Sequence, residues 1–387
     1  MSGARRLVIA GGGPAALAAA RGYRDAGGGA HVVLVTDDDR PPYRRPPLSK
    51  EYLRGELDAS ELALERAEWY PAHYVEIVHD QVVELDPVAR RARTESGREL
   101  AYEGAVLATG ATPVRPPVDG ADGPGVRVLR TAASSEDLAS VTGTETRVVV
   151  VGAGFIGCEA AVSLARRGAR VTLVADEGVP QERRLGADVG GRIASWLQQE
   201  GVELLLGAPI DAIDPGPDVL VGDVRIAADV VLLGSGVEPR DRLARDAGLA
   251  LGPDGRHVAV DATMATSAPG VRAAGDVTFA GHAVAGRSLH VEHWGDALAH
   301  GEVAGRRLAG DTEAQWDGVP GFWSTIGDRT LKYAAWGDGY DSVELESDGE
   351  AFTAWYRRDG RVVGVLTHDR DEDYDMGAER IAAEVAT

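Results

Sequence analysis

The sequence predicts an α/β protein with two doubly wound parallel sheets and a small C-terminal α+β unit. A short apolar strand runs into a glycine-rich turn and then a helical segment twice, at Gly11–Ala16 and at Gly152–Gly157. From Trp316 onwards the composition changes to alternating aromatic strands followed by a last helix. A chain of 387 residues is long enough to bury two or three separate cores.

Each glycine-rich turn begins a βαβ unit, so the chain contains an internal repeat of a Rossmann-like fold. After the first turn, residues 17–25 are helical and 31–35 form an apolar strand; after the second, the matching segments are 158–167 and 170–174. Each second strand is followed by one small residue and an acid, Asp37 or Asp176. Two such units in one chain predict two bound dinucleotides.

The turns suit dinucleotides because glycine lets the backbone approach a pyrophosphate and the helix N-terminus supplies N–H donors. The acid after each second strand can accept hydrogen bonds from ribose hydroxyls. Asp37 and Asp176 are the candidates, although either could be a plain surface acid and Glu177 is an equal neighbour of Asp176. The candidate turn residues are Gly11, Gly13, Pro14 and Ala15 in the first unit, and Gly152, Gly154, Phe155, Ile156 and Gly157 in the second.

The composition excludes several classes of function. The formal net charge is −21 with the acids scattered along the chain, so no basic face is expected for a nucleic acid. Cys158 is the one cysteine, which rules out an intramolecular disulfide or a dithiol pair. No uncharged apolar run is long enough to span a bilayer, and no apolar signal-like stretch follows Arg6, so we expect a soluble, cytoplasmic protein.

Other segments are assigned from their local patterns. Residues 82–85 and 91–95 are typical of antiparallel strands, and the proline-rich residues 43–50 are expected to lack regular structure. Three buried strands end in the turns Ala108-Thr109-Gly110, Gly234-Ser235-Gly236 and Gly275-Asp276, and a helix is expected from about His293 to Leu308. We place the first unit at 1–114 and 246–315, the second at 115–245 and the third at 316–387.

In this order and spacing, the two glycine turns and the three strand-end motifs resemble the flavin- and pyridine-nucleotide-dependent reductases built on the glutathione reductase plan. The resemblance implies that the first unit binds FAD and the second binds NAD(P)H. It also implies FAD contacts from Ala108, Thr109, Gly110, Gly275 and Asp276, and NAD(P)H contacts from Ser235 and Gly236.

One loop narrows this resemblance. Disulfide-using members of the family carry a cysteine pair after the first βαβ unit, and coenzyme A disulfide reductases carry one cysteine there, whereas residues 42–50 of this chain contain no sulfur. Thiol chemistry at the flavin is thereby excluded. The run Arg45-Pro46-Pro47-Leu48-Ser49-Lys50 instead resembles the putidaredoxin and rubredoxin reductase branch and its relative, apoptosis-inducing factor.

This branch implies a catalytic pair, Lys50 and Glu159, beside the point where hydride arrives. Lys50 would stabilise the negative charge of the reduced flavin, and a buried Glu159 needs such a partner. Phe155 takes the place of an aromatic gate that moves when nicotinamide docks, although packing against the sheet explains it equally well. Cys158 is expected to be a small buried residue.

The resemblance implies further FAD contacts from residues distant in sequence: Arg45, Val82, Arg130, His293 and Trp294. His293 is given no proton-transfer role, because a histidine at a helix start is more often structural. The C-terminal unit shares Phe322-Trp323-Ser324 with this branch, near the flavin edge that an electron partner approaches. It departs from the branch at Gly321, where an aromatic residue is common.

Together these residues predict an FAD-dependent reductase that passes electrons from NADH to a small iron–sulfur protein, a ferredoxin, of an oxygenase or P450 system. Gly157 and the acids after residue 174 favour NADH, while Arg183 and Arg184 keep NADPH as the alternative. The competing functions are an NADH oxidase or quinone reductase without a protein partner, and a redox-sensing protein similar to apoptosis-inducing factor. A monomer and a homodimer both stay open, and no metal site is expected.

Overall fold

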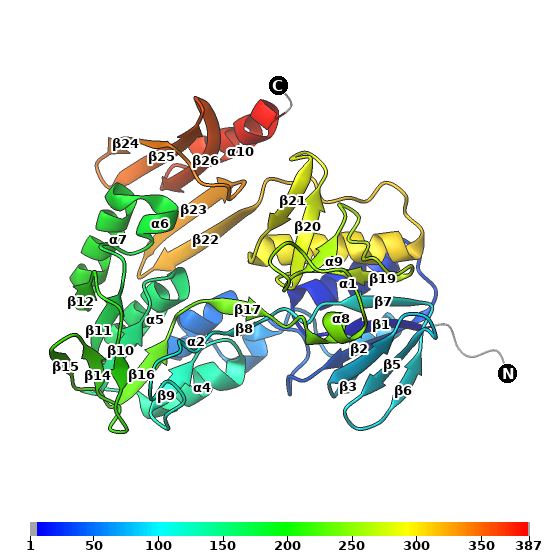
Figure 1. Cartoon of the computed structure of the whole chain (residues 1–387), viewed down its shortest axis with the longest axis horizontal. Coiled ribbons are helices and arrows are strands. Elements are labelled where there is room, and N and C mark those ends of the chain that lie inside the picture. The colour runs from blue at the N-terminus through cyan, green and yellow to red at the C-terminus, as the bar shows by residue number, and fades with distance from the viewer. Residues whose placement is uncertain (1–5, 386–387) are drawn as a thin grey trace.

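The first parallel sheet has the strand order β19-β7-β1-β2-β3 and takes its strands from two distant parts of the chain. The computed structural model describes residues 6–385 (Figure 1). The strands are β1 (Arg6–Ala10), β2 (His31–Thr36), β3 (Val75–His79), β7 (Gly104–Leu107) and β19 (Val271–Ala273), all paired in parallel. Helices α1 (Pro14–Asp25) and α9 (Trp294–Ala309) contact each other and this sheet.

The second parallel sheet repeats this plan with the order β12-β11-β10-β16-β9. Valine- and leucine-rich strands form it because both faces of a parallel sheet are covered. Its central strand is β10 (Arg147–Val151), and α5 (Phe155–Arg166) follows directly. The other members are β9 (Val126–Val128), β11 (Arg170–Ala175), β12 (Glu203–Leu206) and β16 (Val230–Leu233), with helices α4 (Ala132–Val141) and α7 (Ala187–Gln199).

Two short strands connect these sheets. The chain leaves the first sheet through β8 (Ala111–Pro113) and returns through β17 (Val237–Pro239), and the two strands pair antiparallel. Gly110 (φ +68°) and Gly236 (φ +95°) precede them in left-handed conformations that favour glycine. The Thr109 hydroxyl donates to the carbonyl of Arg240 and the Ser235 hydroxyl to that of Val114, each at 2.8 Å.

Smaller sheets and short helices complete the two nucleotide-type units. The sheets are β4 (Val82–Asp86), β5 (Arg91–Thr94) and β6 (Glu99–Ala101); β13 (Ala212–Ile213), β14 (Val219–Val221) and β15 (Val224–Ile226); and β18 (Val258–Val260), β20 (Thr278–His282) and β21 (Arg287–His290). The short helices are α2 (Glu51–Arg54), α3 (Trp69–Ala72), α6 (Glu182–Leu185) and α8 (Arg242–Asp246), with 3₁₀ turns η1 (Pro46–Ser49) and η2 (Ala59–Leu62).

The C-terminal unit is an antiparallel sheet with a helix packed on it. Its order is β22-β23-β26-β25-β24, and α10 (Asp371–Val385) contacts β26 and β23. The strands are β22 (Gly321–Ile326), β23 (Arg329–Ala335), β24 (Ser342–Asp348), β25 (Ala351–Arg358) and β26 (Arg361–His368). In Figure 1 this unit lies over α6 and α7 of the second unit, and β22 runs down towards α5.

The predicted fold class is confirmed, with several local differences. Residues 43–50, expected to be irregular, contain the 3₁₀ turn η1, because Pro46 and Pro47 supply the φ values that a helical turn needs at its start. Strands β22 and β24 and helix α7 were not predicted from the sequence. Within residues 6–385, no helix is both long enough and apolar enough to cross a membrane.

Helices α1 and α9 approach each other through glycine. A Cβ added at Gly301 would lie 2.2 Å from the carbonyl oxygen of Ala15, and one at Gly305 would lie 2.1 Å from that of Ala19. Backbone contact of this kind needs hydrogen in place of a side chain. The first glycine turn is therefore held against the helix that carries His293 and Trp294 at its start.

His300 is buried between these elements in its neutral form. Its Nδ1 lies 3.4 Å from the Thr278 hydroxyl, which itself donates to the carbonyl of Gly275 at 2.8 Å. Its Nε2 has no hydrogen-bond partner among the described residues. Burial lowers the pKa of His300 from 6.5 to about 4, although the charges of Asp296 and Asp276 oppose the change.

We expect His300 to make the protein less stable in acid. Between pH 6.5 and about 4 this imidazole is protonated in the unfolded chain but not in the folded chain. The free energy of unfolding therefore decreases as the pH is lowered through this range. The contribution reaches about 3 kcal/mol at the acidic end of that window. Denaturant unfolding at pH 7.5 and 4.5 measures it, and His300→Gln should lose stability less steeply. An identical pH dependence in the variant would contradict the assignment.

Candidate functional site

The first glycine turn is pressed against the end of β7. Gly11 has φ +132°, and a Cβ there would lie 2.0 Å from the carbonyl oxygen of Ala108. A Cβ at Gly12 would lie 2.1 Å from the Thr36 hydroxyl, whereas one at Gly13 would come no nearer than 4.0 Å to another group, Arg45 Nη2. Gly13 is the N-cap of α1 and provides no side chain to bond the first N–H groups. Those N–H groups remain available to a phosphate.

The second turn has the same construction. A Cβ at Gly152 (φ +105°) would lie 2.5 Å from the carbonyl oxygen of Gly234, and one at Gly157 would lie 2.1 Å from that of Gly152. The N-cap of α5, Gly154, also lacks a side-chain cap. Both cradles that a dinucleotide needs are thus present, each with an open helix N-terminus.

Arg45 and Arg130 place positive charge beside the first turn. Arg130 Nη2 donates to Asp276 Oδ2 at 2.6 Å, and Arg45 Nη1 donates to the carbonyl of Arg130 at 3.1 Å. Within residues 6–385, Arg45 forms no ion pair, and its Nη2 is 4.0 Å from the position of a Cβ on Gly13. Burial lowers the pKa of Arg45, and the charge of Arg130 lowers it further. This cationic excess next to open N–H donors suits a diphosphate.

Both predicted ribose acids form ion pairs with an arginine. Asp37 Oδ2 contacts Arg240 Nη2 at 2.5 Å; burial opposes ionisation of Asp37, but Arg240 lowers its pKa overall. Asp176 Oδ2 contacts Arg183 Nη2 at 2.6 Å. The sequence places Arg183 some way beyond the strand, but the chain folds back through α6 and brings it to the end of β11. That Asp37 and Asp176 bind the ribose hydroxyls stays a prediction.

The structure brings Lys50 and Glu159 together in a buried ion pair. Lys50 Nζ lies 3.0 Å from Glu159 Oε2, and both side chains are less than a tenth exposed. The Ser49 hydroxyl donates to the same oxygen at 2.5 Å. Glu159 Oε1 accepts from the Ser324 hydroxyl at 2.7 Å and from the backbone N–H of Thr325 at 3.2 Å. Four donors therefore surround one carboxylate, which offsets the cost of burying it.

Three units of the fold supply this cluster. Ser49 and Lys50 come from the end of η1, Glu159 from the second turn of α5, and Ser324 from β22. Sequence reasoning paired Lys50 with Glu159 but missed Ser49, Ser324 and Thr325. Their contacts span 110 to 166 residues, and no local pattern marks them.

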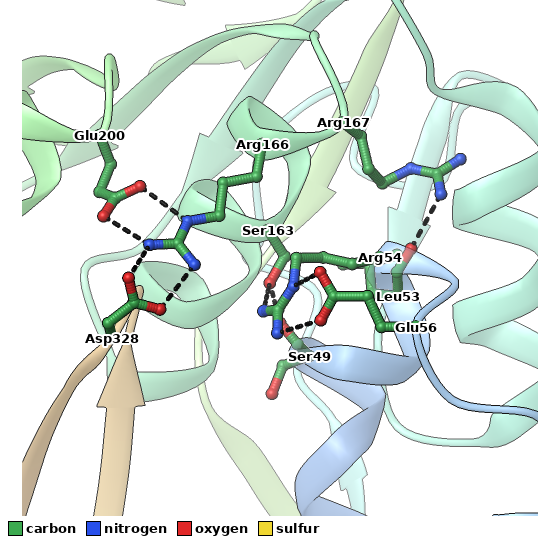
Figure 2. A network of polar contacts seen from close by, with 9 residues as sticks. All are labelled: Ser49, Leu53, Arg54, Glu56, Ser163, Arg166, Arg167, Glu200 and Asp328. Atoms are coloured by element: carbon green, nitrogen blue, oxygen red, sulfur yellow. Dashed lines mark hydrogen bonds and ion pairs between the residues drawn. The ribbon is translucent and has the colours of Figure 1, made fainter.

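A second polar network, further along α5 from Glu159, contacts the same three segments (Figure 2). The Ser163 hydroxyl donates to the carbonyl of Ser49 at 2.7 Å, and Arg54 Nη1 donates to Ser163 at 3.3 Å. Arg166 bridges Glu200 and Asp328 with contacts of 2.8 to 3.0 Å, as Figure 2 shows. The loop that carries Lys50 is thus fixed to α5 by side chains that lie outside the cluster itself.

Aromatic rings extend from the second turn to the start of α9. Phe155 packs on Phe322 with ring centroids 4.7 Å apart, and Phe322 packs on His293 at 4.8 Å. His293 Nδ1 lies 3.2 Å from Asp296 Oδ2, in keeping with a structural histidine. Phe155 therefore has a packing partner, and its movement as a gate stays a prediction. The neighbouring Ile156 is 41% exposed, so part of its apolar side chain faces solvent.

The absence of a side chain at position 321, where the branch often has an aromatic residue, has a steric explanation. A Cβ there would lie 2.8 Å from the Tyr374 hydroxyl and 3.0 Å from the carbonyl oxygen of Tyr333. Tyr374 of α10 thus occupies the space next to this glycine. An open cavity of about 460 Å³ lies beside it, lined by one side of α9 from Gly295 to Arg306 and by Trp316, Gly321 and Tyr374.

The remaining candidates take different places. Cys158 is fully buried and burial raises its pKa, as expected of a core thiol. Thr109 and Ser235 use their hydroxyls on the β8–β17 connection. Val82 begins β4 and is buried, Trp294 begins α9, and Gly275 precedes Asp276 with φ +79°. Contacts of these residues with a cofactor stay predictions.

We expect Glu159→Ala to destabilise the protein by about 3–5 kcal/mol, because it leaves the Lys50 ammonium buried without a counter-charge. The double variant Lys50→Met, Glu159→Leu should recover most of that loss, since it removes both charges. Denaturant unfolding of the two variants measures the difference. If both variants were destabilised equally, the unpaired Lys50 charge would not be the cause of the loss of stability.

Comparisons with known proteins agree with this geometry. The family model described as pyridine nucleotide-disulphide oxidoreductase matches residues 5–301. Rhodocoxin reductase of Rhodococcus erythropolis is 32% identical over 353 residues, covering 88% of this chain and 81% of the relative.

Two solved structures are similar over nearly the whole chain. The ferredoxin reductase of the CYP199A2 system from Rhodopseudomonas palustris has a TM-score of 0.92 at 29% identity, covering 98% of this chain and 95% of that one. A putidaredoxin reductase in covalent complex with putidaredoxin has a TM-score of 0.92 at 28% identity, covering 98% and 93%. The chain belongs to the pyridine nucleotide-disulphide oxidoreductase family.

Proposed function

We propose that this protein is an FAD-dependent reductase that takes hydride from NADH and passes electrons to a small iron–sulfur protein of an oxygenase system. The observation that carries the proposal is the buried Lys50–Glu159 pair in a chain with two dinucleotide cradles and no cysteine on the Lys50 loop. The names of its relatives support this acceptor: rhodocoxin reductase, a ferredoxin reductase, and a reductase captured with putidaredoxin.

The first turn fits FAD. Its open N–H groups and Arg45 would hold the pyrophosphate, and Asp276, already oriented by Arg130, would meet the polyol chain. When bound, FAD couples a two-electron donor to a one-electron acceptor. The second turn would hold NADH, with Asp176 towards the adenosine ribose.

Lys50 and Glu159 have distinct tasks in this arrangement. Lys50 holds a positive charge in a buried site, where it would stabilise negative charge on the reduced isoalloxazine if FAD is bound as proposed. Glu159 keeps that ammonium in one position, because its two oxygens are fixed from opposite sides by η1 and β22. With no thiol on the Lys50 loop, electrons leave towards an external acceptor.

An acceptor screen of the FAD-loaded protein tests the proposal. NADH should drive reduction of a [2Fe–2S] ferredoxin much faster than reduction of oxygen or a quinone. Lys50→Met should lower the NADH-dependent rate by about 100-fold. Lys332→Met is the matched control, because Lys332 is the other lysine of the chain and its ammonium pairs with Asp371 at 2.7 Å rather than with Glu159.

Two outcomes would overturn the proposal. Oxygen or quinone turnover equal to the ferredoxin rate would identify an oxidase or quinone reductase. A change of oligomeric state on addition of NADH, without turnover, would identify a redox sensor.

We further expect NADH to be preferred over NADPH. At the end of β11, the two acids Asp176 and Glu177 lie beside one arginine, Arg183, which is already paired with Asp176. A 2′-phosphate would therefore meet a net negative charge there. Asp176→Asn should free Arg183 and shift the NADH:NADPH ratio of kcat/KM towards NADPH by about tenfold, or 1.4 kcal/mol. Steady-state kinetics with both cofactors measures the ratio. Adding Arg183→Ala should cancel the gain, and a gain that persists would contradict this cause.

A further inference from the structure

Two histidines and a glutamate gather beside the small sheet β18–β20–β21, just before the start of α9. His257 directly precedes β18, His290 ends β21, and Glu292 follows two residues later. Strand β20 pairs with β18 on one side and β21 on the other. The sheet thus brings His257 to His290, although the two are far apart in the sequence.

The three side chains each place a possible ligand atom close to the other two. One ligand atom from each residue lies within 4.8 Å of those of the other two. His290 Nε2 is 3.3 Å from Glu292 Oε1, and the imidazole rings of His257 and His290 have centroids 3.9 Å apart. His290 and Glu292 are exposed, so the cluster opens to solvent on that side.

His257 is the informative member. The residue is 7% exposed, and its Nε2 is shielded from solvent without any hydrogen-bond partner among the described residues. Its Nδ1 contacts the carboxylate of Asp254. Because a carboxylate accepts, this contact places the proton of the neutral imidazole on Nδ1 and leaves Nε2 with an unused lone pair. A buried acceptor left in this state is unfavourable unless something binds it.

Asp254 is itself fixed in position. Its Oδ1 accepts from the backbone N–H groups of Arg256 at 3.0 Å and His257 at 3.2 Å. A carboxylate that orients the far nitrogen of an imidazole is the usual outer partner of a metal-bound histidine. Two imidazole nitrogens and one carboxylate oxygen are a ligand set that divalent zinc accepts, with a fourth position left for water.

We propose that His257, His290 and Glu292 bind one divalent transition-metal ion of the zinc class, with Asp254 orienting His257. Zinc needs ligand atoms about 3.3 Å apart, given Zn–N bonds of 2.0–2.1 Å in a tetrahedral site. The exposed side chains of His290 and Glu292 can rotate to reach that spacing, while His257 is already held. The ion would join β18 to the segment entering α9, whose first residues are His293 and Trp294. This inference does not rest on the proposed redox function.

Zinc titration of the FAD-loaded, tag-free, chelator-treated protein tests the site by isothermal calorimetry. One equivalent of Zn²⁺ should bind, and the thermal midpoint should rise with it. His290→Gln and His257→Gln should each weaken binding by at least 100-fold, and Asp254→Asn by 10- to 100-fold. His31→Gln is the matched control, because His31 also lies beside a glutamate, Glu76, with 3.9 Å between the two side chains.

The outcomes separate a built site from surface binding. Unchanged affinity in His290→Gln would overturn the proposal, as would an equal loss of affinity in His31→Gln. Because His257 is buried and its variant could fail to fold, the exposed His290→Gln and Glu292→Gln variants carry the test independently. Co²⁺ provides a second readout: d–d absorption at longer wavelength than the flavin band, present in the parent protein and absent in His290→Gln, would support the site.

Discussion

A single buried carboxylate holds the three units of this protein in register. Glu159 accepts hydrogen bonds from η1 of the first unit and from β22 of the third, while its own helix belongs to the second. Each donor alone contributes modestly, but an unpaired charge in this position is costly, so the donors are required together. The cradles are local features, whereas their relative placement depends on this contact and on the Arg54, Ser163 and Arg166 contacts behind it.

The parts predicted well from the sequence were those encoded by short-range patterns. Glycines at 11 and 152 must touch the neighbouring strand end, and valine-rich strands must be covered on both faces, so the turns and central strands were predictable. Pairing of Lys50 with Glu159 came from resemblance alone. Ser324 and Thr325 were missed because their role exists only after β22 reaches α5. Arg183 shows the same limitation, since its contact with Asp176 depends on how α6 folds back.

The family is named for a disulphide, but this chain has a single cysteine and cannot form one within itself. Its one cysteine is buried in the core around α5, and its thiol donates to the carbonyl of Ala153 at 3.5 Å. On the loop where relatives of the disulfide type carry sulfur, two prolines shape a 3₁₀ turn that ends at Lys50. The chain has only two lysines among its 40 lysine and arginine residues, and one of them lies here. Lysine suits this position better than arginine would. Its compact ammonium on a flexible side chain reaches the buried carboxylate, whereas the planar guanidinium of an arginine has more N–H donors that would each need a partner.

The β8–β17 connection also bears on how such a chain can be assembled. Pro113 and Val237 are paired neighbours in that ribbon, so everything between them leaves and re-enters the first sheet at one point. A segment whose two ends lie side by side can be inserted into a host fold without separating the strands of the host. The second nucleotide unit therefore has the geometry of a domain inserted into the first. Exchange for a homologous unit with a different nucleotide preference would leave the first sheet and its glycine turn intact.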